Sequence, residues 1–258
     1  MGEEGRLRTR KEARATATEH LGSAFYALHP GGWRDYVTLL HPPYTLWHLS
    51  YVVLGAALAP AIHYDRLAAT LIAFLLALGF AAHALDELSG RPLKTQIPSP
   101  ALWLIAIAGL GGAVGLGVAG SIAVTPWLLA FVAFGLFIAP AYNLEWFGGM
   151  FHTDYWFALA WGSFPFLTAY WVNGERFELS ALAGAAAAFG LSLAQRTLSY
   201  RVRTIRRRVR EIEGTVLYLD GRSERIDRAW ALAVEERALL LLSGTAIAVS
   251  VAALLTRV

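Results

Sequence analysis

The chain has 258 residues, of which 56% are hydrophobic and only 16% are charged, and its mean hydropathy is +0.47. Soluble domains carry about a quarter charged residues, so this composition predicts an integral membrane protein. The sequence contains no cysteine, which excludes disulfides, thiolate nucleophiles, iron–sulfur clusters and cysteine-ligated zinc. The formal charge of +3 is unevenly spread because the arginines are clustered.

Residues 1–40 are mixed in polarity, and we expect them to lie at the cytoplasmic membrane surface. Their second half is moderately amphipathic, with Phe25, Tyr26, Trp33 and Tyr36 among its apolar positions, as in an interfacial segment. No apolar stretch follows the first charges, so no cleaved signal peptide is expected. The prolines at 42 and 43 then interrupt the chain.

Seven apolar runs follow, each close to the roughly 20 residues that cross a bilayer. They cover residues 45–62, 67–86, 101–119, 125–143, 155–173, 179–195 and 236–256. Several are rich in Gly and Ala, which allow helices to approach closely in lipid. The sequence therefore predicts an all-α, polytopic membrane bundle with about seven transmembrane helices. Its expected parts are an N-terminal segment (1–40), a transmembrane bundle (41–195), a basic insert (196–235) and a final transmembrane helix (236–258).

The densest basic stretch runs from 196 to 210, and positive charge marks cytoplasmic loops. Alternation of the spans then places the N-terminus and the segments 87–100, 144–154 and 196–235 on the cytoplasmic side of the cytoplasmic membrane. Arginines 206–210 are interpreted as anchors to anionic lipid, at roughly 1 kcal/mol each. Residues 213–227 alternate in polarity around an Asp-Gly turn and predict a small hairpin. We expect no nucleic-acid partner, because no aromatic residues interleave the basic run.

Polar groups cluster where the second span ends. On a helix, His83, Asp86 and Glu87 share one face, and ionisable groups at such a depth indicate a functional site. Carboxylates favour Mg²⁺ or Mn²⁺, and added imidazoles favour Mn, Fe or Zn. The predicted metal ligands are His83, Asp86, Glu87, Glu145, His152 and Asp154. For Asp154, capping of the fifth span is an alternative to metal ligation.

Basic residues on the same side suit a phosphate group, since arginine binds phosphate bidentately and lysine acts as a point charge. The predicted phosphate ligands are Arg91, Lys94, Arg196 and Arg201. For Arg91 and Lys94, plain anchoring to lipid is an equal alternative. Tyr142, Asn143, Trp161 and His48 complete the predicted substrate contacts, although a hydrogen-bonded helix-packing role is open for His48. Together these groups predict a lipid diphosphate partner, with its head at the interface and its tail among the helices.

Three stretches, in this order, resemble the UbiA superfamily of intramembrane prenyltransferases. They are LLHPPYTLWHLSYVVLGAALAP at 39–60, AAHALDELSGRPLKTQIPS at 81–99 and AYNLEWFGGMFHTDYWFALAWGSFPFLTAYWVNG at 141–174. The resemblance implies a helical bundle with a cytoplasm-facing cavity, in which Mg²⁺ on two Asp-rich motifs binds a prenyl diphosphate and promotes its ionisation. The position of the second motif reads LAQRTLSYRVRTIRRR here and has no carboxylate. Either the 145–154 ligands supply the missing contacts, or arginines replace a metal.

The resulting functional prediction is a diverged UbiA-like enzyme that transfers or cyclises an isoprenoid diphosphate, with Asp86, Glu87 and His83 as its catalytic residues. Two alternatives stay open. One is a transition-metal enzyme that hydrolyses or oxidises a membrane lipid with the same His, Asp and Glu cluster. The other is a non-catalytic lipid-binding or assembly protein. The sequence does not identify a protein partner.

Overall fold

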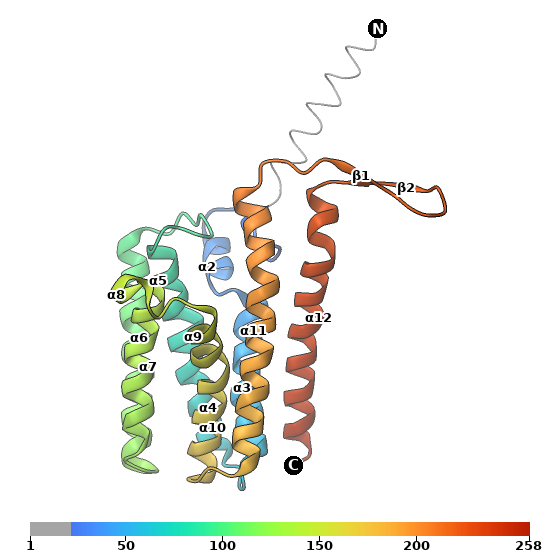
Figure 1. Cartoon of the computed structure of the whole chain (residues 1–258). Helices are drawn as coiled ribbons and strands as arrows, with labels where there is room; N and C mark the ends of the chain where they lie inside the picture. Colours follow the sequence, from blue (N-terminus) through green and yellow to red (C-terminus); the bar gives the residue numbers. More distant parts are fainter. Residues whose placement is uncertain (1–21) are drawn as a thin grey trace, which may run out of the picture.

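The computed structural model describes residues 22–258 as a bundle of long helices that lie side by side (Figure 1). Seven helical segments make up the bundle, and each contains most of one of the apolar runs expected from the sequence. They are α3 (Pro42–Leu58), α4–η1–α5 (Tyr64–Phe74, Leu75–Ala82, His83–Leu88), α6 (Ser99–Ala123), α7 (Leu128–Asn143), α9–η2–α10 (Asp154–Ala158, Leu159–Ser163, Phe164–Gly174), α11 (Leu179–Arg208) and α12 (Arg228–Leu255).

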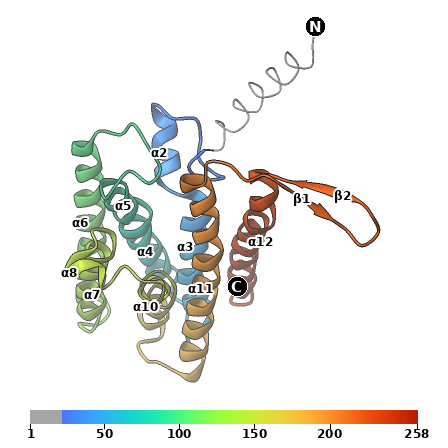
Figure 2. The same ribbon diagram turned by 45° about the horizontal axis from the view of Figure 1, so that its top comes forward.

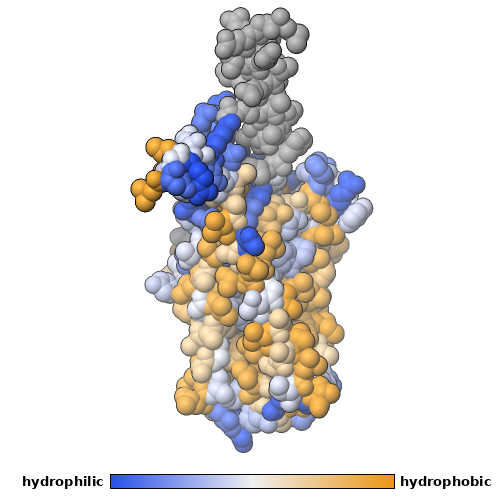
Figure 3. Space-filling model, turned by 90° about the vertical axis from the view of Figure 1, so that its right-hand side faces the viewer, coloured by the Kyte–Doolittle hydropathy of each residue, from blue (hydrophilic) through white to orange (hydrophobic). Residues whose placement is uncertain are grey.

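Three helical segments are long and apolar enough to cross a membrane: Tyr64–Leu88, Ser99–Ala123 and Arg228–Leu255. Leu128–Asn143 is also apolar but shorter. Figure 3 shows apolar side chains over most of the height of one face of the bundle, with hydrophilic residues gathered towards its two ends. Leu240, Leu241 and Val251 of α12 are among the exposed apolar residues. This pattern agrees with an all-α membrane protein, since hydrocarbon favours an apolar outer surface.

Shorter elements lie towards one end of the bundle. They are α2 (Trp33–Leu39), α8 (Trp146–Gly149) and the antiparallel hairpin of β1 (Gly214–Leu217) and β2 (Ser223–Ile226). The hairpin confirms the turn predicted from the sequence, and it extends away from the bundle beyond α12 (Figure 2). Within α2, the expected interfacial character holds in part, because Trp33 and Tyr36 are exposed whereas Leu39 is buried. The remainder of the expected N-terminal segment, residues 1–21, lies outside the described residues.

Close approach of helices explains the abundance of small residues. A Cβ at Gly55 of α3 would lie 2.2 Å from the carbonyl oxygen of Phe166 in α10, so these two helices meet at a glycine. Trp47, Tyr51 and Phe166 fill the core around this contact, and the Trp47 indole nitrogen donates to the Tyr51 hydroxyl at 2.5 Å. The small-residue pattern thus has the packing role that membrane bundles require.

Two helical segments differ from the expected boundaries. α11 continues without a break through residue 195 to Arg208, because no helix-breaking residue interrupts the switch from an apolar to a basic sequence. α12 begins at Arg228 rather than near 236, because the Asp227 side chain accepts a hydrogen bond from the Trp230 backbone N–H and caps the helix there. Glu235, Glu236 and Arg237 interrupt the apolar sequence within α12, so the expected run marks only the later part of the helix. Both differences lengthen helices beyond the apolar bundle.

The segments α4–η1–α5 and α9–η2–α10 each contain a π-helix, η1 and η2 respectively. π-helical stretches are rare and frequently occur at functional sites. At one end of the bundle, the segment before α3, the loop after α5, the loop before α9 and the basic end of α11 come together (Figure 1). This grouping agrees with the alternation of spans expected from the sequence. The chain ends at the opposite end of the bundle.

Candidate functional site: an arginine-lined cavity

A cavity of about 330 Å³ opens at the end of the bundle where these segments meet. Its wall is built by the segment 23–26, the start of α3, η1 with α5, the end of α7, the 152–161 segment and the basic part of α11. We call it the arginine cavity, because Arg196, Arg203, Arg207 and Arg208 line it. Asp86 is the only acidic side chain among its described lining residues, so the cavity carries an excess of positive charge.

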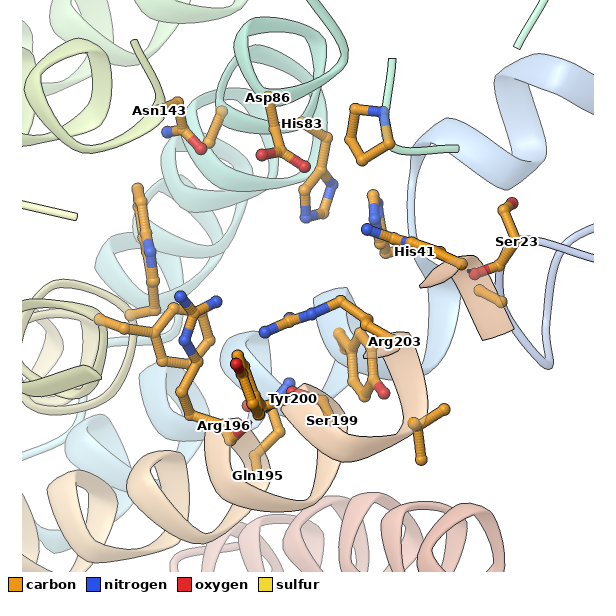
Figure 4. A pocket seen from close by; sticks show the side chains of 18 of the residues that line it. Ser23, His41, His83, Asp86, Asn143, Gln195, Arg196, Ser199, Tyr200 and Arg203 are labelled. Atoms are coloured by element: carbon orange, nitrogen blue, oxygen red, sulfur yellow. Dashed lines mark hydrogen bonds between the residues drawn. The ribbon is translucent and has the colours of Figure 1, made fainter. Parts of the chain in front are cut away.

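One face of α11 supplies the arginines. Arg196, Arg203 and Arg207 are seven and four residues apart, which places them along one side of a continuous helix. Figure 4 shows Arg196 and Arg203 on one side of the cavity and Asp86 and His83 on the other. Like charges on one helix repel each other, so this arrangement favours an anion between the arginines.

The arginines differ in how far the protein already satisfies them. Arg196 pairs with Asp154 at 2.7 Å and lies over the Phe157 ring at 5.3 Å from its centroid. Arg207 donates from Nε to the carbonyl oxygen of Ser23 at 3.3 Å. Within the described residues, Arg203 has no hydrogen bond or ion pair, and it faces the cavity. Its guanidinium is therefore the donor most available to a ligand.

Three buried polar atoms in the wall also lack a hydrogen-bond partner among the described residues. They are Nδ1 of His48, the hydroxyl of Tyr142 and Oε1 of Gln195. Each side chain is more than nine-tenths buried. Because an unpaired buried polar group costs about 1–3 kcal/mol, such groups are uncommon in native proteins. Their concentration around one cavity indicates a polar ligand or ordered water inside it.

Histidines form part of the wall opposite α11. The rings of His41 and His83 lie 4.1 Å apart between centroids, and their Nδ1 atoms contact the carbonyl oxygens of Leu39 at 2.8 Å and Gly79 at 3.1 Å. A carbonyl only accepts, so Nδ1 carries the proton and Nε2 presents a lone pair when the ring is neutral. Burial, and then the proximity of His83, lower the pKa of His41 well below its ordinary value. His41 is therefore neutral at pH 7.

The floor of the cavity is apolar and aromatic. Tyr142 stacks on His152 at 4.5 Å between centroids and meets Trp161 edge to face at 5.7 Å. Leu78 of η1 and Trp161 of η2 line this floor, so both π-helices face the cavity. The expectation that Tyr142, Asn143, Trp161 and His48 share one cavity agrees with this geometry. The arrangement offers a cationic rim above an apolar floor.

The six predicted metal ligands do not come together. Among residues 22–258, no three His, Asp or Glu side chains are grouped as a metal site. Glu87 is fully buried, and its carboxylate accepts hydrogen bonds from the backbone N–H of Leu93 and from the backbone and hydroxyl of Thr95, at 2.8–2.9 Å. Glu145 is exposed and does not line the cavity. Glu87 does not join the predicted cluster because Asp86 and Glu87, although adjacent, point to different sides of α5.

The remaining predicted ligands divide between the cavity and its edge. His83, Asp86 and His152 line the cavity, and the Nδ1 of His152 contacts the carbonyl oxygen of Tyr142 at 2.9 Å. Asp154 lies at the start of α9, in the first turn after the capping residue Thr153, and reaches the cavity only through its ion pair with Arg196. The alternative interpretation of Asp154, as a residue that stabilises the start of this helix, agrees with that position.

Three predicted phosphate ligands lie outside the cavity. Arg91 donates to the carbonyl oxygen of Ile97 at 2.6 Å and to the Ser99 hydroxyl at 2.8 Å, so it holds its own loop together. Lys94 is exposed on that loop, and Arg201 pairs with Glu235 of α12 at 2.9 Å. Only Arg196 of the four predicted phosphate ligands lines the cavity.

Sequence reasoning missed several cavity residues. They are Tyr26, His41, Tyr44, Arg203, Arg207 and Arg208. The last two were interpreted as lipid anchors, but α11 turns them towards the cavity, whereas Arg206 points to Glu236 of α12 and donates to it at 2.5 and 3.0 Å. The seven- and four-residue spacing of the arginines was the available signal, and it becomes visible once α11 is extended beyond residue 195.

No family model, no curated protein and no solved structure matches the chain. The resemblance to the UbiA superfamily stays a prediction from the quoted sequence stretches.

Proposed function

We propose that the chain is a diverged UbiA-like membrane enzyme that binds an isoprenoid diphosphate in the arginine cavity and transfers or cyclises its isoprenoid group. The observation that carries this proposal is the face of α11, where Arg196, Arg203 and Arg207 line one side of a cavity whose described wall contains a single carboxylate. In this proposal all seven helical segments span the cytoplasmic membrane, and the cavity opens to the cytoplasm. The arginine-rich end then obeys the positive-inside rule.

The diphosphate head fits the rim of the cavity. A guanidinium donates two parallel hydrogen bonds to phosphate oxygens, and such charge-assisted bonds are about twice as strong as neutral ones. Arg203 has its donors free for this purpose within the described residues, and Arg207 retains those not used on Ser23. The Tyr142 hydroxyl and Gln195, which lack partners, lie in the same wall. Binding an anion here would relieve repulsion between the arginines.

The isoprenoid chain fits the floor. Leu78, Ala82, Phe157 and Trp161 give it an apolar, partly aromatic lining that continues into the bundle. Isoprenoid burial stabilises the complex by roughly 25 cal/mol for each Å² of apolar surface removed from water. The cavity therefore suits an amphiphile, because its cationic rim matches a charged head and its apolar floor matches the attached chain.

The reaction follows from this placement. The allylic C–O bond breaks, and its electron pair leaves with the diphosphate, whose developing charge Arg196, Arg203 and Arg207 stabilise. The aromatic rings of Tyr142 and Trp161 stabilise the allylic cation by cation–π attraction. A nucleophilic carbon of an acceptor, or a double bond of the same chain, forms the new bond and then releases a proton. His83, with a lone pair on Nε2, is the proposed proton acceptor.

In this proposal, Mg²⁺ would bind together with the diphosphate substrate. The described residues form no group of three metal ligands, so these residues alone provide no complete site. Asp86 would be the carboxylate that holds a Mg²⁺ ion arriving with the diphosphate, because this ion commonly binds one or two carboxylates together with substrate phosphates. When bound, Mg²⁺ supplies further stabilisation of charge on the leaving diphosphate.

A second candidate is a lipid-diphosphate-binding protein without catalysis. It is favoured by Glu87, which the sequence assigned to catalysis and which the structure commits to hydrogen bonds with its own loop. Asp86 is then the only acidic side chain left for chemistry among the described cavity residues.

A ligand series tests the binding proposal. Purified protein in detergent is titrated with geranylgeranyl diphosphate, geranylgeraniol and inorganic diphosphate, each with and without Mg²⁺. We expect geranylgeranyl diphosphate to bind at least tenfold more tightly than either fragment, because it alone occupies the rim and the floor. Equal binding of the alcohol and the diphosphate would exclude the arginine cavity as the site. Diphosphate binding that does not respond to Mg²⁺ would remove the metal from the proposal.

Release of inorganic diphosphate from the bound substrate separates the two candidates. It is measured after incubation with a lipid extract from the host membrane, and the prenylated or cyclised product is identified by mass spectrometry. Release at a rate above that of an Asp86→Asn variant supports the enzyme. Tight binding with no release supports the second candidate.

A further inference from the structure

A second cavity, of about 320 Å³, lies between a different set of helices. We call it the apolar cavity. α4, α6, α7 and α10 line it, mostly with Ala, Gly, Leu, Val and Phe residues. Its size is within the range of small-molecule sites, which are about 300–1,000 Å³.

Two features of the sequence leave this space open. Small side chains on the facing helices, including Ala73, Ala77 and Ala113, provide little volume to fill it. α7 packs against α6 and η1, whereas its contact with α10 is slight. Phe131 of α7 and Phe164 at the start of α10 stack at 6.3 Å between centroids and bridge the gap. Both rings line the cavity, which lies between the separated helices.

The apolar cavity is separate from the arginine cavity. The core cluster of Leu78, Ile138 and Trp161, together with Leu110 and Phe134, lies between them. Leu78 and Trp161 line only the arginine cavity, and Leu110 lines only the apolar one. A ligand in one cavity therefore does not extend into the other without a rearrangement of this cluster.

The polar groups of the apolar cavity lie at one end. Asp65 and Arg66, at the start of α4, line that end, which is opposite to the arginine cavity. Arg66 donates from Nη1 to the carbonyl oxygen of Val172 at 2.8 Å and to Glu175 at 2.9 Å. A zwitterionic or polar head group meets both signs of charge at this end, while an attached chain would point into the bundle.

The deeper wall offers no free polar group among the described residues. The hydroxyls of Thr70 and Thr168 donate to the carbonyl oxygens of Arg66 and Phe164, both at 2.7 Å. Water in this part of the cavity would find few partners, and a buried water normally makes about three hydrogen bonds. An apolar occupant is favoured instead.

We propose that the apolar cavity binds one acyl chain of a bilayer phospholipid, whose head group lies at Asp65 and Arg66. The cavity is flanked by Tyr64–Leu88 and Ser99–Ala123, two of the helical segments that are long and apolar enough to cross a membrane. Hydrocarbon is therefore the medium at its opening. A chain that enters from the adjacent leaflet fills the space without exposing any polar group. This proposal is independent of the diphosphate chemistry in the arginine cavity.

A photoreactive phospholipid tests the proposal. The protein is reconstituted in phosphatidylcholine nanodiscs that contain a phosphatidylcholine with a diazirine at the middle of one acyl chain. After illumination, cross-linked peptides are mapped by mass spectrometry. We expect cross-links to concentrate at α6 and α7 residues that line the cavity, at least threefold above those on the exposed face of α12. An even distribution over all exposed apolar helices would overturn the proposal.

Filling the cavity provides a matched control. Ala113→Phe places a large ring in the cavity, whereas Ala108→Phe adds the same ring to an exposed position of α6 outside it. We expect only Ala113→Phe to reduce cavity cross-links, by at least threefold, and undiminished cross-linking in this variant would overturn the proposal. If Ala113→Phe does not fold, Ala73→Phe fills the same space from α4. Titration with geranylgeranyl diphosphate should be unchanged in these variants, so the outcome is distinguishable from failure of the diphosphate proposal.

Discussion

The loop 89–98 and the inner face of α11 are both basic, but their charges have different relations to the chain around them. In the loop, Arg91 donates to the Ile97 carbonyl and to the Ser99 hydroxyl at the start of α6. Glu87 accepts three hydrogen bonds from loop residues. On α11, Arg203 faces a cavity and has no hydrogen bond to a described residue. A charge that its own chain satisfies maintains the structure, whereas a charge left facing a cavity is available to a ligand.

This difference is useful because Asp86 and Glu87 are adjacent and carry the same functional group. Helical geometry turns the first towards the arginine cavity and the second towards the loop. Substitutions of Glu87 and Arg91 should therefore change stability, and substitutions of Arg203 and Asp86 should change ligand binding.

The largest effect is expected for Glu87→Ala. It removes the acceptor of three hydrogen bonds and leaves two backbone N–H groups buried without partners, which costs about 3–4 kcal/mol of unfolding free energy. Thermal unfolding of the purified protein in detergent measures the loss. The matched variant Asp86→Ala should change the unfolding temperature much less, because the Asp86 side chain makes no hydrogen bond to a described residue. Equal destabilisation by the two variants would contradict the division of roles.

Arg203→Gln should have the next largest effect, and on binding rather than on stability. Loss of one charge-assisted pair of hydrogen bonds costs about 2 kcal/mol, which weakens geranylgeranyl diphosphate binding roughly 30-fold. Arg201→Gln is the control, because Arg201 is two residues away on α11 but pairs with Glu235 at the surface. Isothermal titration on both variants gives the comparison. Equal weakening of binding by the two substitutions would show that geranylgeranyl diphosphate does not bind in the arginine cavity.

Arg91→Gln is expected to be a milder, structural change. It removes hydrogen bonds to Ile97 and Ser99 from a partly buried side chain, so unfolding free energy should fall by about 1–2 kcal/mol. Diphosphate affinity should stay within twofold of the wild type, because the guanidinium does not line the cavity. A tenfold loss of affinity with unchanged unfolding temperature would restore Arg91 to the phosphate-binding role that the sequence suggested.

Much of the fold was predictable because helices in a membrane are specified by long apolar runs. Each of the seven expected runs lies mostly in a helix, and the hairpin was visible in its polarity and turn. The exceptions have local causes. The end of α11 was misplaced because apolarity stops at residue 195 while the helix continues. The start of α12 was misplaced because Glu235, Glu236 and Arg237 interrupt its apolar sequence, whereas Asp227 caps the helix further upstream.

The candidate site was less predictable, because it depends on which way side chains turn. His83, Asp86, Arg196 and Tyr142 were identified and do share a cavity. Glu87 could not be distinguished from Asp86 in the sequence, since its partners at 93 and 95 depend on how the loop folds back. His41 was hidden because it occupies a left-handed turn before α3, which places its ring on His83 from a distant part of the chain.

The smallest effect expected concerns pH and His41, which packs on His83 in the wall of the arginine cavity. Burial and the neighbouring His83 hold the pKa of His41 below its ordinary value, so the unfolded chain takes up this proton near pH 6.5 and the folded chain does not. The contribution of His41 to stability is therefore complete above about pH 6.5 and is lost as pH falls below it, by about 1 kcal/mol at pH 5.5. His41→Asn, in which asparagine tolerates the left-handed backbone (φ 46°), removes the titrating group. The unfolding temperature should then fall less between pH 7.5 and 5.5 than in the wild type, and an unchanged pH dependence would show that His41 has the same pKa in the folded and the unfolded protein.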